Sequence, residues 1–164
     1  MNAVSVRPYR ADDAPALAAI FRASVETLTV REYSAVQRRT WMAHGPTAER
    51  LASAYADGRV ALVAEADGAP AGFSDVEADG HIGFLYVAPF AARRGVARAL
   101  LCAVEEAALA QGIARLYAEA SETALPAFLA CGFVHVARRD FEVAGVAVHN
   151  HAVEKRLPAA PPPV

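Results

Sequence analysis

Residues 85–101, with the sequence LYVAPFAARRGVARALL, decide how this chain folds. They read as the end of a buried strand, a loop and the first turns of a helix, with the small residues Gly95 and Ala97 where the helix begins. The first turn of a helix leaves backbone N–H groups without partners and carries the positive end of the helix dipole. Small side chains let a phosphate approach those groups, and Arg93, Arg94 and Arg98 add positive charge. The segment therefore fits a pyrophosphate. A helix that merely begins with solvated arginines is the alternative, and spacing alone does not separate the two.

Two common phosphate-binding motifs are excluded at this position. The Gly-Lys-Ser/Thr ending of a Walker loop is missing, and so is the G-x-G-x-x-G of a Rossmann fold. Any phosphate site here must follow a different pattern.

Elements on either side of the segment are predicted from hydrophobic periodicity. Alternating residues predict strands at 4–9, 60–66, 70–77, 81–87, 115–119, 133–143 and 146–157. Helical spacing predicts helices that begin at Asp12 or Asp13, at the capping box of Ser34 and Gln37, after Thr47, and over 95–111 and 123–131. The expected order is β-α-α-β-β-β-α-β-α-β-β, which is a mixed α/β (α+β) fold with helices on both faces of a mostly antiparallel sheet.

Length and composition favour one folded domain and exclude several classes of protein. The chain has 164 residues, 55% apolar residues and a net charge of −2. We expect a single domain over residues 1–157 and a disordered proline-rich tail over 158–164. The charge balance argues against nucleic acid, and no run approaches the roughly 20 apolar residues of a membrane span. An N-terminus without an apolar segment and two isolated cysteines favour the cytoplasm.

Two motifs resemble the GNAT superfamily of acyl-CoA-dependent N-acetyltransferases. The sequence Gly95-Val96-Ala97 before Ala99-Leu100-Leu101 is similar to its motif A, Q/R-x-x-G-x-G/A, with Arg93 at the first glycine and Phe90 at the Gln/Arg position. Residues 120–133, ASETALPAFLACGF, resemble its A-S-x-N-A-x-x-F-Y-x-x-x-G-F ending. The element order agrees from residue 4 to residue 157. A bacterial YafP-like branch is indicated more weakly, by Tyr33, Ser34, Gln37 and Trp41.

The resemblance implies a binding site for acetyl-CoA as acyl donor, in a V-shaped opening between the fourth and fifth strands. The fourth strand would pair with the pantetheine amides, a backbone N–H near Val87 would stabilise the developing oxyanion, and the start of the helix would hold the pyrophosphate. Thr123 and Phe128 occupy family positions for Asn and Tyr in the second motif. The implied donor-binding residues are Leu85, Tyr86, Val87, Arg93, Arg94, Gly95, Val96, Ala97, Arg98, Thr123 and Phe128.

In this family the amine attacks the thioester directly, and two proton transfers remain to be assigned. An ammonium group with a pKa of about 10 must lose a proton before it attacks. His81 is a candidate base, with Glu77 and Glu119 as alternatives, although each also reads as a solvated strand residue, and a chain of waters is a further possibility. The Tyr that usually protonates the leaving thiolate is replaced by Phe128, which cannot donate a proton and is expected to pack against the pantetheine arm.

The acceptor is expected to be the primary amine of a small molecule or peptide, bound at the first two helices. Arg31, Tyr33, Gln37 and Trp41 are the candidate acceptor-binding residues. His149 and His151 share one face of a strand but have no evident third ligand, so no metal is expected. The sequence leaves the oligomeric state open, with a homodimer as one possibility because dimers are common in the family.

Two other functions compete with catalysis. The missing Tyr also fits a non-catalytic acyl-CoA-binding module. A nucleic-acid-binding protein would have to use the scattered Arg93, Arg94, Arg98, Arg138 and Arg139, and the net charge makes this the weakest of the three.

Overall fold

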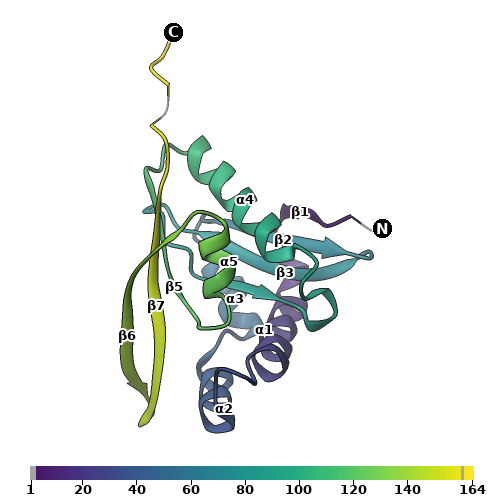
Figure 1. Ribbon diagram of the computed structural model, residues 1–164. Helices are drawn as coiled ribbons and strands as arrows, with labels where there is room; N and C mark the ends of the chain where they lie inside the picture. Colours follow the sequence, from purple (N-terminus) through teal and green to yellow (C-terminus); the bar gives the residue numbers. More distant parts are fainter. Residues whose placement is uncertain (1–2, 160) are drawn as a thin grey trace.

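Two antiparallel sheets form the framework of the computed structural model, which describes residues 3–159 and 161–164. The first sheet has the strand order β1-β2-β3-β4, and the second has the order β5-β7-β6 (Figure 1). The strands are β1 (Ser5–Pro8), β2 (Val60–Ala66), β3 (Ala69–Val76), β4 (Leu85–Val87), β5 (Arg115–Ala120), β6 (Val134–Val143) and β7 (Val146–Arg156). The mixed α/β fold class expected from the sequence is confirmed.

Helices lie on both faces of the first sheet. They are α1 (Ala14–Leu28), α2 (Ala35–His44), α3 (Ala48–Ala54), α4 (Val96–Ala110) and α5 (Leu125–Ala130), with short 3-10 turns at Ala11–Asp13 and Pro89–Ala91. Because successive strand residues point to opposite faces, β2 sends Val63 into a core with α1 and α3, and sends Ala64 into a core beneath α4. The same alternation in β3 sends Phe73 toward α1 and Ala71 toward α4.

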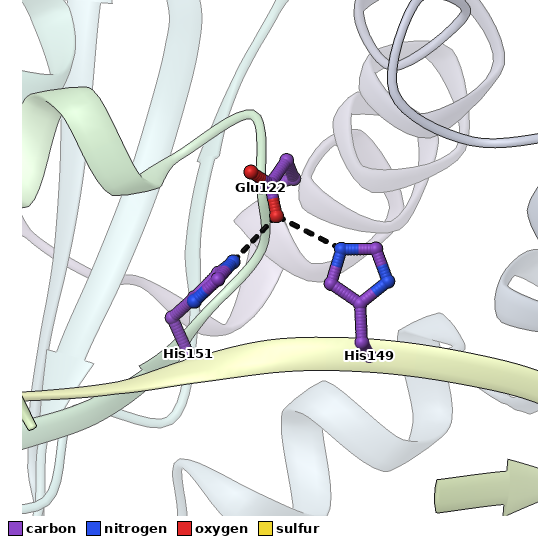
Figure 2. A group of neighbouring side chains, drawn as sticks. All are labelled: Glu122, His149 and His151. Carbon is purple, nitrogen blue, oxygen red and sulfur yellow. Dashed lines mark hydrogen bonds and ion pairs between the residues drawn. The ribbon is translucent and has the colours of Figure 1, made fainter. Parts of the chain in front are cut away.

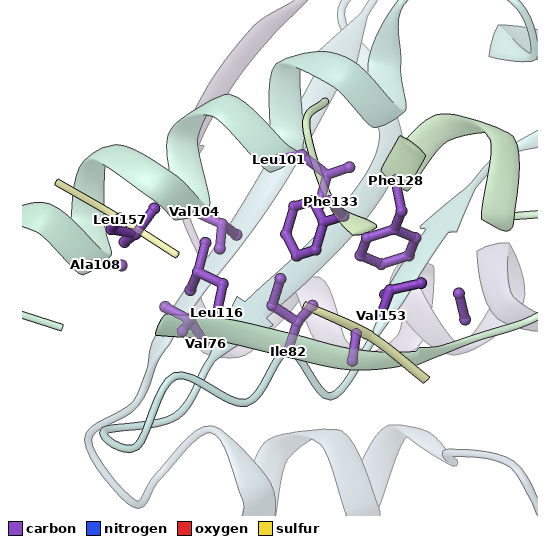
Figure 3. Close-up of a cluster of buried hydrophobic side chains, with 12 residues drawn as sticks. Val76, Ile82, Leu101, Val104, Ala108, Leu116, Phe128, Phe133, Val153 and Leu157 are labelled. Carbon is purple, nitrogen blue, oxygen red and sulfur yellow. The ribbon is translucent and has the colours of Figure 1, made fainter. Parts of the chain in front are cut away.

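A third core fills the space between α4, α5 and the second sheet (Figure 3). Leu101 and Val104 of α4 meet Leu116 of β5 there, and Phe133 joins them from the turn after α5. All four side chains are at most 4% exposed. This core fixes α4, and therefore its first turn, relative to β5.

The two sheets are joined by one short parallel contact and then separate. Residues 81 and 117 form an isolated parallel bridge, in which the N–H of Ile82 donates to the carbonyl of Tyr117 at 2.9 Å. The N–H of Tyr117 in turn donates to the carbonyl of Gly80 at 3.1 Å. Beyond this bridge β4 and β5 are not paired, and a hollow between them is lined by Leu85, Tyr86 and residues 118–121. The two strands therefore separate in the region where the family resemblance implies an opening.

The fourth strand is shorter than the sequence predicts: residue 81 forms only the isolated bridge, and the expectation of a strand over 82–84 is wrong. Side chains of β3 bond the backbone of this segment in place of a ladder. The buried Asp75 carboxylate accepts the N–H of Gly83 at 2.6 Å and that of Phe84 at 3.3 Å, and the Ser74 hydroxyl donates to the carbonyl of Phe84 at 2.7 Å. Alternating residues predict a strand equally well in either case, so periodicity could not reveal this.

The C-terminal segment carries neither helix nor strand at residues 158–159 and 161–164. Residues 1, 2 and 160, which belong to the expected domain and tail, lie outside the described residues. Over the part of the chain that is described, no helix combines the length and the apolar character needed to cross a membrane.

Candidate active site

The larger of two neighbouring clefts, with a volume of about 620 Å³, runs along β4 to the start of α4. One wall is formed by Leu85, Tyr86 and Val87, and the opposite wall by Thr123, Ala124 and their neighbours before α5. The loop before α4 and the first turn of this helix close one end, which is lined by Arg93, Gly95, Val96, Ala97 and Arg98. Nine of the eleven residues expected to bind the donor therefore line a single cleft.

The backbone at the start of α4 has a conformation that glycine favours. Gly95 is the N-cap residue with a φ of 82°, and Arg93 has a φ of 62°. No atom lies within 4 Å of the position that a Cβ on Gly95 would occupy, so this residue keeps the mouth of the cleft open. The N–H groups of the following residues belong to the first helical turn and point out of the helix end. An anion in the cleft meets these groups together with Arg93 and Arg98.

Two residues expected to bind the donor do not line this cleft. The Arg94 guanidinium turns toward the β2–β3 hairpin and pairs with Asp67, with Nη1 at 2.7 Å from Oδ2. Phe128 is only 2% exposed and packs edge-on against Phe133, with ring centroids 5.0 Å apart. Its ring belongs to the core between α4, α5 and the second sheet, and it reaches only the small hollow between β4 and β5.

A second cleft of about 310 Å³ lies between α2 and the β6–β7 hairpin. Tyr33, Gln37 and Trp41 line it, as expected from the sequence, whereas the exposed Arg31 does not. The opposite wall contains Phe141, Val148, His149 and Asn150 of the hairpin, and the floor contains Glu119 and Ser121. The wall is largely apolar, with a carboxylate at the floor, which suits a ligand that carries an amine on an apolar body.

Hydrogen bonds tie α2 and the loop before it to the second sheet. The Tyr33 hydroxyl accepts the N–H of Glu122 at 2.8 Å and donates to the carbonyl of His149 at 3.3 Å. Gln37 Nε2 donates to the carbonyl of Ala147 at 3.0 Å, while its Oε1 completes the capping box with Ser34. These contacts hold the second cleft between elements that are 89 to 116 residues apart in the sequence.

The two clefts meet at Trp41, Tyr86 and Ser121, which line both of them. Trp41 Nε1 donates to the Tyr86 hydroxyl at 3.2 Å. Burial raises the pKa of the Tyr86 phenol, so this hydroxyl keeps its proton at neutral pH. Ligands in the two clefts would approach each other at this point.

The three candidate bases form one chain of contacts. His81 Nε2 lies 2.6 Å from Glu119 Oε2, and His81 Nδ1 lies 3.5 Å from Glu77 Oε1. Glu77 is also bound by Arg59 at 2.9 Å. Burial opposes the charged imidazole, but the bonds and charges of Glu119 and Glu77 outweigh it and raise the pKa of His81. Only Glu119 reaches the second cleft, and His81 and Glu77 lie behind it.

His149 and His151 were expected to have no third metal ligand, but the structure places a carboxylate, Glu122, beside them. His149 and His151 of β7 both point at the Glu122 carboxylate, which comes from the loop between β5 and α5 (Figure 2). Glu122 is 27 residues away in the sequence, so local spacing gave no sign of it. The stated reason for expecting no metal is therefore wrong.

Sequence reasoning missed the contribution of the β6–β7 hairpin to the second cleft. Phe141, Val143, Val148 and Asn150 lie on strands that read as an ordinary closing hairpin. The exposure of the Phe141 ring, 40%, marks it as more than a core residue, but this is visible only in the structure.

Comparison with known proteins identifies the family. The sequence profile of the acetyltransferase (GNAT) domain matches residues 29–155. The structure is similar to a GCN5-related N-acetyltransferase from Rhodopseudomonas palustris, with a TM-score of 0.86, 34% identity, and 96% of this chain and 98% of that chain covered. No curated protein sequence matches at a significant level. The chain belongs to the GNAT acetyltransferase family, and it is an acetyltransferase, as the sequence motifs indicated.

Two more distant structures share the fold. The PaiA N-acetyltransferase of Thermoplasma acidophilum, solved with coenzyme A, has a TM-score of 0.74 at 18% identity and covers 94% of this chain and 99% of its own. A phosphinothricin acetyltransferase from Sinorhizobium meliloti, solved with acetyl-CoA, has a TM-score of 0.70 at 20% identity and covers 94% and 88%. The YafP-like branch stays a prediction.

Proposed function

We propose that this protein is an N-acetyltransferase that moves the acetyl group of acetyl-CoA to the primary amine of a small molecule or peptide. The observation that carries the proposal is that a long cleft ending at a helix N-terminus meets a second, carboxylate-floored cleft at Tyr86. A donor and an amine bound in these clefts bring their reacting atoms together, and such orientation supplies much of the rate. The cytoplasmic location expected from the sequence stays a prediction, and so does a homodimer.

Acetyl-CoA would lie along β4 with its pyrophosphate at the first turn of α4. The N–H of Ala88 donates to Ala71 of β3 at 2.7 Å, so the N–H of Val87, the preceding residue, points away from β3 and toward the cleft. This group is suited to stabilise the negative charge that develops on the thioester carbonyl oxygen. The complexes of related acetyltransferases with coenzyme A and acetyl-CoA support this choice of donor.

Glu119 would receive the proton of the attacking amine. Its carboxylate faces the acceptor cleft and is bonded to His81, which can take the proton on and hold it between Glu119 and Glu77. Nitrogen then forms a bond to the acetyl carbon as the carbon–sulfur bond breaks. The general base and its partner make the amine a nucleophile at neutral pH.

Tyr86 would protonate the leaving thiolate, which is the role that Phe128 cannot fill. Its hydroxyl lines both clefts and accepts a hydrogen bond from Trp41, which leaves its own proton free to point at the sulfur. The family resemblance gave this role to the position of Phe128, whose ring lies in the core. Burial raises the pKa of this phenol, which keeps it protonated before the reaction but also makes it a weak acid that gives up its proton only as negative charge develops on the sulfur.

Calorimetric titration with acetyl-CoA tests where the donor binds. Gly95→Glu places a charged side chain on a residue of positive φ at the mouth of the cleft, so we expect at least a 100-fold loss of affinity, about 2.7 kcal/mol. Gly112→Glu is a matched control, because Gly112 also has positive φ and open space but lies after the far end of α4. Equal affinities in the two folded variants would contradict the placement.

A non-catalytic acyl-CoA-binding module is the second candidate, and the phenylalanine at position 128 favours it. Such a module would bind acetyl-CoA with the same dependence on Gly95 but would release no thiol with any amine.

A further inference from the structure

Three side chains that no catalytic step uses converge between β7 and the loop after β5. His149 Nε2 lies 2.8 Å from Glu122 Oε2, and His151 Nε2 lies 2.5 Å from the same oxygen. Figure 2 shows the carboxylate pointing down between the two rings, which rise from one face of the strand. The ligand atoms of all three residues lie within 4.8 Å of one another. Two imidazole nitrogens and a carboxylate oxygen are thus gathered around one point.

Each of the three residues is also held from its other side. His151 is buried, and its Nδ1 lies 2.9 Å from Nε2 of His135 on the neighbouring strand β6. The His149 ring stacks on the buried Tyr33 ring, with centroids 5.6 Å apart. The same tyrosine binds the backbone N–H of Glu122. The group is therefore built into the framework and does not consist of mobile surface side chains.

The His135 contact can accommodate the tautomer of His151 that a metal needs. In the contact with the Glu122 carboxylate, Nε2 of His151 carries the proton and Nδ1 accepts from His135 Nε2–H. Metal binding requires the other tautomer, in which Nδ1–H of His151 donates to His135 Nε2 and the lone pair of His151 Nε2 is available as a ligand. A metal-bound histidine commonly uses its second nitrogen in this way, which fixes the ring and raises its basicity. Replacing the two N–H···O contacts with bonds of about 2.0–2.2 Å to a central ion requires only a small spreading of the three groups.

We propose that Glu122, His149 and His151 form a binding site for a divalent transition-metal ion of the Zn²⁺ class. Two imidazoles and one carboxylate suit Zn²⁺ and Co²⁺, and three protein ligands leave a further position for water. Mg²⁺ and Ca²⁺ prefer all-oxygen sites and do not fit this set. A bound ion would tie β7 to the loop between β5 and α5, which borders both clefts. The inference does not depend on acetyl transfer.

Titration of the metal alone into the full-length, chelator-treated protein tests the site. We expect one equivalent of Zn²⁺ or Co²⁺ to bind in calorimetry, and no binding of Mg²⁺. The Co²⁺ form should show visible d–d absorption of a four- or five-coordinate ion, without a thiolate charge-transfer band. No saturable Zn²⁺ or Co²⁺ binding up to millimolar concentration would overturn the proposal and leave a purely hydrogen-bonded Glu–His–His cluster.

Single variants locate the metal. Glu122→Gln, His149→Gln and His151→Gln should each weaken Zn²⁺ affinity by at least about 100-fold, more than is typical for loss of an outer-shell partner. His44→Gln, a histidine of α2 outside the cluster, should bind as the unaltered chain does. Near-ultraviolet circular dichroism of the metal-free variants checks that each is folded, and if one variant unfolds the other two carry the test. Retained affinity in the folded variants, or equal loss in His44→Gln, would show binding elsewhere and overturn the proposal.

His135 is a positioning residue in this proposal. His135→Phe should weaken Zn²⁺ binding about 10- to 100-fold, whereas His135→Gln, whose amide oxygen can still accept from His151 Nδ1, should restore much of it. Identical affinities in the two variants would remove His135 from the site.

Discussion

At the scale of single residues, proton transfer depends on the contact between Glu119 and His81. The Glu119 side chain is 37% exposed, which is typical of an ordinary surface residue. Its carboxylate, however, lies at the floor of the acceptor cleft and 2.6 Å from His81, a position from which it can act on a bound amine. His81 can store the proton because its pKa lies above the ordinary value. Glu77 contacts the other nitrogen of the imidazole and is itself bound by Arg59.

Glu119→Gln should lower kcat/KM for the amine by about 10²- to 10⁴-fold, since the amide cannot accept the proton. Acetyl-CoA affinity should not change, because Glu119 does not line the donor cleft. Glu106→Gln on the exposed side of α4 is the control and should behave like the unaltered protein. Turnover of Glu119→Gln at the unaltered rate would leave proton transfer to a chain of waters.

The His81 step also predicts the direction of the pH dependence. Below its raised pKa His81 is already protonated and cannot take a second proton, so kcat/KM should rise with pH through an apparent pKa above the ordinary value for histidine. His81→Gln should lose this inflection and keep the one that belongs to the amine. A pH profile that His81→Gln leaves unchanged would remove His81 from the relay.

Tyr86→Phe should lower kcat by about 100-fold, which is the lower end of the contribution that general acid catalysis makes. The ring would still pack edge-on against Phe21 and near Phe73, so the fold and the KM for acetyl-CoA should be preserved. Comparison of kcat and KM for the two proteins separates a proton donor from a packing residue. An unchanged kcat would show that water protonates the thiolate.

At the scale of elements, the site depends on a short parallel bridge that joins two sheets and then lets them separate. Gly80 begins this bridge. Its φ is 94°, and a Cβ added to it would lie 1.9 Å from the carbonyl oxygen of Arg115 on β5. Only glycine permits both the left-handed conformation and the close approach of the backbones.

Gly80→Ala should therefore lower the free energy of unfolding by about 2 kcal/mol more than a Gly→Ala substitution at a position that has the same backbone conformation but open space around it. Gly58→Ala supplies that reference, because Gly58 has a φ of 91° and no atom within 4 Å of the added Cβ. Urea unfolding of the two variants measures the difference. Equal midpoints would mean that the bridge is not a strained junction.

Elements with a strong local pattern could be predicted from the sequence, and elements shaped by distant contacts could not. The strand over 60–66 and the capping box of Ser34 and Gln37 follow from alternation and local hydrogen bonds, and both are present. The break at 82–84 depends on Asp75 from another strand. The convergence of Glu122 with His149 depends on the pairing of β5 with β7, which places Ala120 opposite His151. The donor motif was readable because it is contiguous. The acceptor wall was not, because it is assembled from segments far apart.

At the scale of the whole molecule, three cores hold the two sheets and their helices together, and the ligand clefts lie where the sheets separate. The core between α4, α5 and the second sheet fixes the helix start at the end of the donor cleft, while α2 and the β6–β7 hairpin enclose the acceptor cleft (Figure 1). The fold therefore explains why a donor and an amine would meet at Tyr86. Family membership establishes acetyl transfer as the class of reaction.

The most direct test of this account is release of free thiol from acetyl-CoA over a panel of primary amines, including amino acids, polyamines, aminoglycosides and peptide N-termini. We predict amine-dependent thiol release with at least one member of the panel, and its loss in Gly95→Glu. Tight binding of acetyl-CoA without thiol release for any amine would contradict catalysis and identify the protein as an acyl-CoA-binding module.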